Sequence, residues 1–241
     1  MNANEEHTMS TRKTRSLMVA AVALAALTWG CQSNGEERAD ATGTESEASS
    51  PESQPASGQP LVTPAGPGQA EATFAGGCFW CMEGPFEKLE GVVEVYSGYT
   101  GGTEKNPTYR QVSSGQTSHV EAVRVIYDPD KIGYEELMQR YWRTLDPTDG
   151  GGQFADRGPH YRPVIYFHDD DQKRIAQRSK TALDESKKFD KPIVVPLEPV
   201  GAFWVAEDNH QNYYKTNSMH YNAYREGSGR GPFLRKVWGN D

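Results

Sequence analysis

The chain has few cysteines and no excess of positive charge. Only Cys31, Cys78 and Cys81 occur among 241 residues, which excludes a dense disulfide framework. Lysine and arginine number 25 against 33 aspartate and glutamate residues, and the net charge is −8. Because nucleic-acid binding requires a basic surface, nucleic acid is excluded as a partner.

A hydrophobic run that could span a bilayer comfortably is also lacking. The apolar segment at residues 17–29 is shorter than the roughly 20 residues that a membrane-spanning helix needs. It follows Arg12, Lys13 and Arg15, which is the pattern of an export signal. Met9 is an alternative start, because the first eight residues add two acidic side chains.

Large apolar side chains are almost absent from residues 32–70, which are rich in Ser, Gly, Pro and Glu. Such a segment cannot bury enough surface to offset the entropy of ordering, so we predict a disordered acidic tether. The composition becomes globular at residue 71. We predict one domain over residues 71–226 and an irregular tail over residues 227–241.

Some segments of this domain have the two-residue hydrophobic period of a strand and others the 3.6-residue period of a helix, and the two kinds do not alternate strictly. We predict loops at residues 100–116 and 146–159. Strands are predicted at residues 72–75, 90–99, 119–127, 162–167, 193–199 and 203–206, and helices at 79–89, 133–145, 169–189 and 209–214. This order indicates an α+β domain, with helices covering a mixed sheet in a two-layer sandwich.

The strongest chemical signal lies in residues 73–83. Gly76 and Gly77 permit a tight turn between a short apolar strand and a helix, which puts Cys78 at or beside the helix N-terminus. The positive end of the helix dipole favours a thiolate there, and a thiolate is a nucleophile. The alternatives are a buried structural cysteine and a zinc site, of which Cys78 and Cys81 would supply only half.

The segment Gly77-Cys78-Phe79-Trp80 resembles the active-site signature of the A-type peptide methionine sulfoxide reductases. The resemblance covers about residues 71–217. Its further motifs, in matching order, are Gly98-Tyr99-Thr100-Gly101-Gly102, Asn106-Pro107-Thr108-Tyr109, His119-Val120-Glu121-Ala122-Val123, His160-Tyr161-Arg162 and Ala206-Glu207-Asp208-Asn209-His210-Gln211. It implies a ferredoxin-like fold and the reduction of methionine S-sulfoxide, free or in proteins, without a metal or other cofactor.

The resemblance also assigns roles to single residues. Cys78 is the nucleophile that becomes a sulfenic acid, and Glu121 is the acid that protonates the sulfoxide oxygen. Tyr109 and Tyr161 match tyrosines whose hydroxyls bind that oxygen, and Asp156 matches a supporting carboxylate. Burial in mid-strand would raise the pKa of Glu121 and keep it protonated, whereas the alternative is an ordinary exposed strand glutamate.

Aromatic residues beside Cys78 suit a methyl-sulfur group. Phe79 and Trp80 are predicted to form the apolar wall of the substrate pocket, with core packing as the alternative. The three histidines His119, His160 and His210 lack metal-ligand spacing, so we interpret them as structural or supporting residues.

A second thiol must resolve the sulfenic acid. Many relatives place resolving cysteines near the C-terminus, but residues 227–241 contain none. Cys81, one helical turn from Cys78, is the candidate, and the resulting disulfide would be reduced by thioredoxin or a similar dithiol. The alternative is that an external thiol resolves Cys78 directly.

The N-terminal part resembles an exported lipoprotein. Gly30 followed by Cys31 is similar to a processing site at which the cysteine is lipidated, and we therefore expect the protein to be anchored at the periplasmic or outer surface. We also expect a monomer. The alternatives are an ordinary signal peptide or an uncleaved anchor.

Two rival functions would use the same features differently. An exported thiol–disulfide exchange protein would use the pair Cys78 and Cys81, but it would need neither an acid nor a methyl pocket. A surface-binding lipoprotein without catalytic activity would leave the aligned motifs unexplained.

Overall fold

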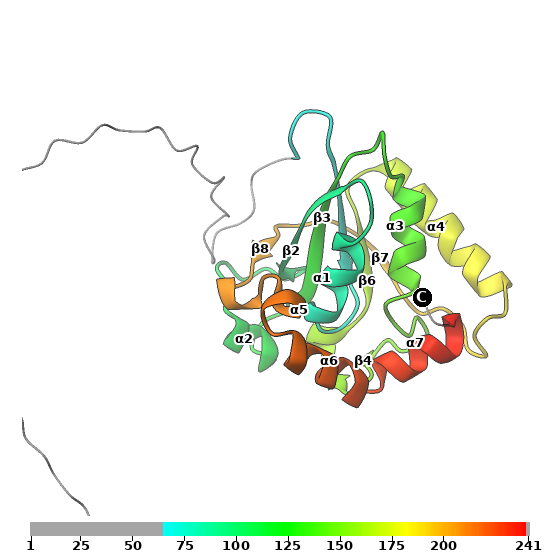
Figure 1. Cartoon of the computed structure of the whole chain (residues 1–241). Coiled ribbons are helices and arrows are strands. Elements are labelled where there is room, and N and C mark those ends of the chain that lie inside the picture. Colours follow the sequence, from blue (N-terminus) through cyan, green and yellow to red (C-terminus); the bar gives the residue numbers. More distant parts are fainter. Residues whose placement is uncertain (1–64, 240–241) are drawn as a thin grey trace, which may run out of the picture. The chain divides into compact units, whose positions relative to one another are not determined.

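A computed structural model of the chain describes residues 65–239 (Figure 1). The predicted export signal, Cys31 and nearly all of the tether lie outside the described residues, and these predictions stay predictions. Within residues 65–239, no helix combines the length and apolarity needed to cross a membrane.

A six-stranded sheet with the order β7-β6-β1-β3-β2-β8 forms the centre of the domain. Its strands are β1 (Ala70–Ala75), β2 (Val92–Thr100), β3 (Val120–Tyr127), β6 (Val164–Phe167), β7 (Leu197–Pro199) and β8 (Trp204–Val205). The β6–β7 pair is parallel and the other pairs are antiparallel, so the sheet is mixed as predicted. The predicted α+β class is confirmed: β1-α1-β2-β3-α3-β6 is the β-α-β-β-α-β order of a ferredoxin-like unit.

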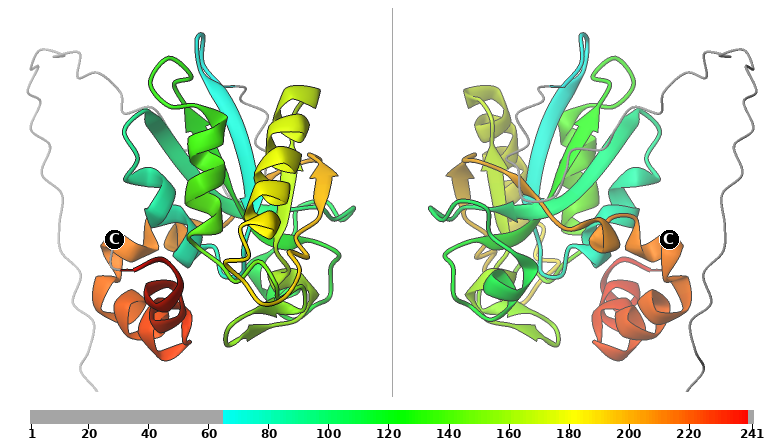
Figure 2. Two further views of the ribbon diagram at one scale, coloured as in Figure 1. Left: turned by 90° about the vertical axis from the view of Figure 1, so that its right-hand side faces the viewer. Right: turned by 90° about the vertical axis from the view of Figure 1, so that its left-hand side faces the viewer.

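Helices α1 (Trp80–Glu87), α3 (Tyr134–Trp142) and α4 (Asp170–Glu185) pack on one face of the sheet (Figures 1 and 2). Short elements follow the main ones: α2 (Tyr109–Ser113), α5 (Tyr213–Thr216), α6 (Ser218–Gly227), α7 (Arg230–Trp238), the hairpin of β4 (Gly152–Gln153) and β5 (Asp156–Arg157), and the 3-10 turns η1 (Pro159–Tyr161) and η2 (Asp208–His210). Of these, α7 and β4 approach the turn between β1 and α1 that carries Cys78.

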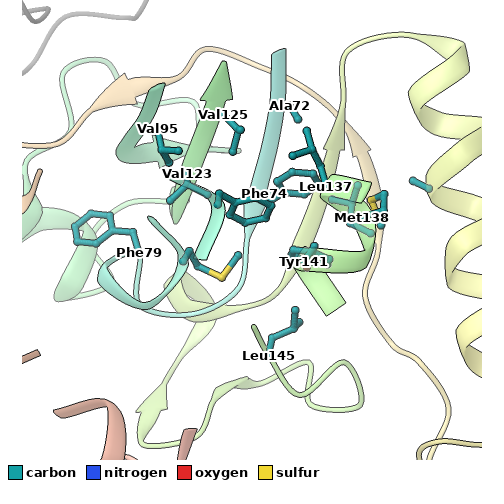
Figure 3. Close-up of a cluster of buried hydrophobic side chains, with 14 of the residues drawn as sticks. Ala72, Phe74, Phe79, Val95, Val123, Val125, Leu137, Met138, Tyr141 and Leu145 are labelled. Carbon is teal, nitrogen blue, oxygen red and sulfur yellow. The ribbon is translucent and has the colours of Figure 1, made fainter. Parts of the chain in front are cut away.

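Aromatic packing holds the end of β1 in the core, where Phe74 and Tyr141 belong to one cluster of buried side chains (Figure 3). The ring of Phe74, near the end of β1, stacks on Phe86 of α1 and on Tyr141 of α3, each at 5.1 Å between centroids. The Tyr141 hydroxyl donates to the Ala75 carbonyl at 2.9 Å. The point at which the chain leaves β1 is therefore held by both helices.

The opposite face of the sheet is covered as well. Ala122 on β3 packs there with Val164 and Tyr166 of β6 and with Phe203 and Val205, which come from the segment around β8. All eight residues of β3 are buried as a result. A carboxyl group on this strand is buried whichever face it points to.

The prediction of an irregular tail is wrong over Arg230–Trp238, where α7 forms. Gly231 and Pro232 both lie in the first turn of this helix, where the N–H that Pro232 lacks costs little. Leu234 is buried, so the domain continues beyond residue 226.

Several predicted boundaries also change. The strand predicted at residues 193–199 shortens to β7, and α2 and the β4–β5 hairpin interrupt the two predicted loops. The short helix predicted at residues 209–214 is replaced by η2, α5 and the unpredicted α6. These pieces are short and polar, and tertiary contacts rather than periodicity hold them in place.

Candidate active site around Cys78

A tight turn places Cys78 between β1 and α1. Gly77 has φ +87°, and a Cβ atom there would lie 2.6 Å from Arg230 Nη2 and 2.6 Å from Gln153 Cβ. Glycine is thus required by backbone conformation and by close approach. Phe79 is the N-cap of α1, so Cys78 directly precedes the helix, as predicted.

The side chain of Glu121, on β3, contacts the N-terminus of that helix. The Phe79 N–H donates to Glu121 Oε2 at 3.0 Å, and only 1% of Glu121 is exposed. Burial raises the pKa of Glu121 to about 8, with the charge of Asp156 adding to the effect and the Phe79 hydrogen bond opposing it. The alternative of an exposed strand glutamate is excluded, and the carboxyl is protonated at neutral pH.

The thiol of Cys78 is also buried, with 6% of the residue exposed. Burial raises the pKa of the Cys78 thiol well above its ordinary value, and the contact with Cys81 and the charge of Glu121 add to this. Desolvation of a fully buried group is worth up to roughly 3–5 pKa units, more than a helix dipole supplies. The expectation of a resting thiolate at Cys78 is therefore wrong, and the thiol is neutral before substrate binds.

Hydrogen bonds to the backbone at Thr108 and Tyr109 hold Tyr109 in place near Glu121. Thr108 caps α2 through a capping box with Gln111, which makes Tyr109 the first helical residue. Glu207 accepts from the Tyr109 N–H and from the Tyr99 hydroxyl, each at 2.8 Å. Burial, followed by the charge of Glu121, raises the pKa of Tyr109 to about 12, so its hydroxyl keeps the proton that it could donate.

Tyr161, the last residue of η1, comes to the same place. Burial raises the pKa of Tyr161, and the next contributions come from Glu121, Tyr109 and Cys78 in that order. These charge effects fall off with distance, so the two tyrosines lie around one carboxyl and one thiol. The structure therefore brings together Cys78, Glu121, Tyr109 and Tyr161 from four separate segments.

Asp156 on β5 makes its hydrogen bond with a residue that the sequence did not single out. The Tyr224 hydroxyl of α6 donates to Asp156 Oδ1, and Arg230 Nη2 lies 3.9 Å from Asp156 Oδ2. The charge of Asp156 acts on Glu121 and Cys78, so it belongs to the same buried group. Its supporting role in the reaction stays a prediction.

Trp80 forms one side of the site in a stack of rings. Its Nε1–H donates to His210 Nδ1 at 3.2 Å, and the Tyr213 ring lies parallel to the indole at 3.8 Å between centroids. His210 in turn packs against Tyr109 at 4.3 Å. Phe79 is fully buried beside Tyr109 and His210, so it packs in the core; its predicted contact with substrate, like that of Trp80, stays a prediction.

Of the other two histidines, His119 holds a loop and His160 packs on its neighbour. The Gly102 N–H donates to His119 Nδ1 at 3.2 Å, and His119 Nε2 donates to the Glu104 carbonyl at 2.8 Å. His160 packs against the neighbouring ring of Tyr161 at 4.3 Å. Across residues 65–239 there is no cluster of three or more His, Cys, Asp or Glu side chains that could hold a metal ion.

Cys81 lies next to Cys78 without a bond between the sulfurs. Its N–H donates to the Cys78 carbonyl at 3.0 Å, and the two side chains are in hydrogen-bond contact. The hydrogen bond from Cys78 and the charges of Arg230 and Arg225 lower the pKa of the Cys81 thiol. Cys81 is thus the more acidic thiol of the pair.

Three residues of the site were missed from the sequence. Glu207 lies in one of the matching motifs, but the motif predicts no role for it, and Tyr224 is one of 12 tyrosines with no local feature to distinguish it. Arg230 lies in the tail that was predicted to be irregular. It is 1% exposed and donates to the Gly76 carbonyl at 3.2 Å and to the Thr144 carbonyl at 2.5 Å.

Comparison with known proteins gives a consistent result. A sequence model of the family "Peptide methionine sulfoxide reductase" matches residues 70–241. The chain is 51% identical to peptide methionine sulfoxide reductase MsrA of Listeria monocytogenes (serotype 4a, strain HCC23) over 168 residues, which cover 70% of this chain and 95% of that protein. It is 51% identical to the protein of the same name from Bacillus pumilus over 170 residues, covering 70% and 96%.

Solved structures are similar as well. Methionine sulfoxide reductase A of Corynebacterium diphtheriae superposes with a TM-score of 0.56 at 32% identity, covering 64% of this chain and 77% of that chain. Reduced Mxr1 from Saccharomyces cerevisiae superposes with a TM-score of 0.61 at 28% identity, covering 66% and 91%.

Proposed function

Because this chain belongs to the peptide methionine sulfoxide reductase family and is an enzyme that reduces methionine sulfoxide, we propose how its residues share that reaction. The observation that supports the assignment is the position of Glu121. Its buried carboxyl, protonated at neutral pH, is hydrogen-bonded to the residue next to Cys78. An acid and a nucleophile are thus held side by side.

In the proposed first step, the sulfur of Cys78 attacks the sulfoxide sulfur while Glu121 gives its proton to the sulfoxide oxygen. Tyr109 and Tyr161 donate hydrogen bonds to that oxygen. The oxygen then passes to Cys78, which becomes a sulfenic acid, and methionine leaves. The thiol proton returns to Glu121, so that one thiol and one sulfoxide give one sulfenic acid and one thioether.

In the proposed second step, the Cys81 sulfur attacks the sulfenic sulfur of Cys78 and water leaves. A dithiol such as thioredoxin then reduces the disulfide. The hydrogen-bond contact between the two thiols and the lowered pKa of Cys81 support this role. A plain thiol–disulfide exchange protein is not favoured, because it has no use for a protonated Glu121.

The test is a single turnover with methionine sulfoxide and no added reductant. Wild type and Cys81→Ser are expected to release one equivalent of methionine, because this step needs only Cys78. Cys78→Ser is expected to release none, because a serine hydroxyl is a far weaker nucleophile. Methionine release by Cys78→Ser would overturn the assignment. Full thioredoxin-dependent turnover by Cys81→Ser, without a Cys78–Cys81 disulfide in wild type, would remove Cys81 from the mechanism.

We also propose that the enzyme is an exported lipoprotein that acts as a monomer at the periplasmic or outer surface. Residues 17–29 would direct export, Cys31 would carry the lipid, and residues 32–70 would serve as the tether. The support is the order of these three sequence features.

A further inference from the structure

A buried carboxyl group in α1 has no part in the proposed reaction. Glu83 is fully buried, and burial raises the pKa of Glu83 to about 7 against the opposing effect of the Asn212 N–H. Burying a carboxyl group is costly even when it accepts a hydrogen bond, so a gain in stability is a weak explanation for this residue. Its partners indicate a different one.

The Glu83 carboxyl contacts the start of α5, which lies beside α1 (Figure 1). The Asn212 N–H donates to Glu83 Oε1 at 2.8 Å, and the backbone of Tyr213 also lowers the pKa of Glu83. Asn212 has φ +52°, in the left-handed region that residues other than glycine rarely adopt. A residue in this conformation persists only where its surroundings fix it. Glu83 therefore holds the chain at the point where it turns into α5.

The side chain that follows this turn reaches the candidate active site. The Tyr213 ring is nearly parallel to the Trp80 indole, at 8° and with 3.8 Å between centroids. Trp80 directly follows the N-cap of α1 and is the predicted wall for the methyl-sulfur group of the substrate. The direction of the indole thus depends on where Tyr213 is placed.

The other contacts between α1 and this segment involve residues further along α5. The Tyr214 hydroxyl donates to Glu87 Oε2 at 2.5 Å, and Lys215 pairs with the same carboxylate. A Cβ atom at Gly84 would lie 3.1 Å from the Tyr214 ring, so the helix and the segment are closely packed there. These contacts hold the middle of α5, whereas Glu83 holds its beginning.

We propose that Glu83 is a positioning residue for the substrate pocket. By holding the backbone at Asn212 and Tyr213, it places the Tyr213 ring on Trp80 and fixes the indole in the orientation that receives the methyl-sulfur group. The inference rests on the proposed function, and within it on the predicted contact of Trp80 with the substrate. Because Glu83 takes no part in proton transfer, its loss should weaken substrate binding more than it slows the chemical step.

The experiment measures methionine release in a single turnover at increasing concentrations of methionine sulfoxide. Glu83→Met fills the same space without a hydrogen-bond acceptor. It is expected to raise the half-saturating concentration about fivefold, the loss of roughly one aromatic contact, and to leave the limiting rate near that of wild type. Glu83→Gln keeps an oxygen that accepts from the Asn212 N–H, so it is expected to match wild type.

Tyr213 tests the route from Glu83 to Trp80. Tyr213→Leu removes the ring and should raise the half-saturating concentration by a similar factor. In Glu83→Met/Tyr213→Leu the rise should be no larger than in Tyr213→Leu, because both changes act through one ring. Additive rises would overturn the inference. Should Glu83→Met fail to fold, a wild-type half-saturating concentration in Tyr213→Leu would still overturn it.

The matched control is Glu87→Met, which releases Tyr214 and Lys215 in the same segment. Its half-saturating concentration is expected to equal that of wild type. A folding defect alone would lower the amount of methionine released per enzyme without moving the half-saturating concentration. An unchanged half-saturating concentration in Glu83→Met would overturn the inference, as would an equal rise in Glu87→Met or in Glu83→Gln.

Trp80→Leu separates the inference from the proposed function on which it rests. If Trp80→Leu leaves the half-saturating concentration unchanged, the predicted substrate contact of Trp80 fails and the inference fails with it. If Trp80→Leu raises that concentration but Glu83→Met does not, only the inference about Glu83 fails.

Discussion

At the scale of the residue, the proposed chemistry depends on a carboxyl group that keeps its proton. Glu121 sits on a strand covered on both faces, and burial makes its charged form costly. We expect Glu121→Gln to slow methionine release in a single turnover by roughly ten- to ten-thousandfold, the usual range for a positioned acid. Exposed Glu135 on α3 is the control site, and Glu135→Gln is expected to match wild type. A fast Glu121→Gln variant would mean that another group protonates the oxygen.

The pH dependence of that step follows from the same residue. The pKa of Glu121 is raised to about 8, so the donating form dominates below that pH and is lost above it. The single-turnover rate should therefore decline as pH rises through about 8. Burial puts the pKa of Cys78 well above its ordinary value, so thiolate formation cannot compensate until higher pH. The decline should be absent from the residual rate of Glu121→Gln, and an alkaline decline of equal size in that variant would contradict the assignment.

Gly77 is required for two separable reasons. Its φ of +87° strains any other residue, and a Cβ atom would also collide with Arg230 and Gln153. Gly115 has φ +71°, but a Cβ atom there would have no other atom within 4 Å. A substitution at Gly115 therefore tests the backbone conformation without the close approach. We expect Gly115→Ala to lower the free energy of unfolding by about 1 kcal/mol and Gly77→Ala by clearly more. Urea denaturation measures both, and equal losses would show that the close approach is tolerated.

At the scale of the element, α7 supports the turn between β1 and α1 that carries Cys78. Arg230 donates to the Gly76 and Thr144 carbonyls and lies near Asp156, all in the interior. We expect Arg230→Ala to lower the free energy of unfolding by about 3–5 kcal/mol, because the buried partners are left without it. Methionine release should also slow, because the loop before Cys78 loses its support.

The control for this prediction lies on the same helix. Arg235 pairs with Glu226 at an exposed position, so Arg235→Ala should cost at most about 1 kcal/mol. Thermal or urea unfolding of both variants provides the comparison. If the two variants lost equal stability, the interior contacts of Arg230 would not carry the effect.

At the scale of the whole molecule, the domain is joined to a segment with features of a lipoprotein. We expect wild type to sediment with membranes and Cys31→Ala to be released, because the lipid would be attached to that cysteine. Cell fractionation measures this, and a detached Cys31→Ala enzyme should reduce methionine sulfoxide as wild type does. If Cys31→Ala stayed with the membrane, residues 17–29 would be the anchor.

Much of the chemistry could be predicted from the sequence because local patterns carry it. The glycine pair before Cys78 permits a tight turn, and the apolar periods of β1, β3, α3 and α4 follow from short-range packing rules. The ends of helices and strands were predicted less well than the elements themselves. A strand such as β7 extends only as far as a neighbouring strand pairs with it, and local sequence does not show that pairing. The motifs predicted the nucleophile, the acid and the two tyrosines, and the fold places these four residues together; their roles in the reaction stay predictions.

The tertiary structure alone decided the electrostatics and the role of the C-terminal part. A helix N-terminus predicted a thiolate at Cys78, but burial is a property of the whole fold and it raises the pKa of that thiol. Arg230 and Tyr224 have no signal in local sequence, because their partners Gly76 and Asp156 are about 150 and 70 residues away. Contacts over such separations form only when the sheet brings the segments together. The sequence by itself therefore determined which groups are proposed to react, whereas the fold determined their protonation and support.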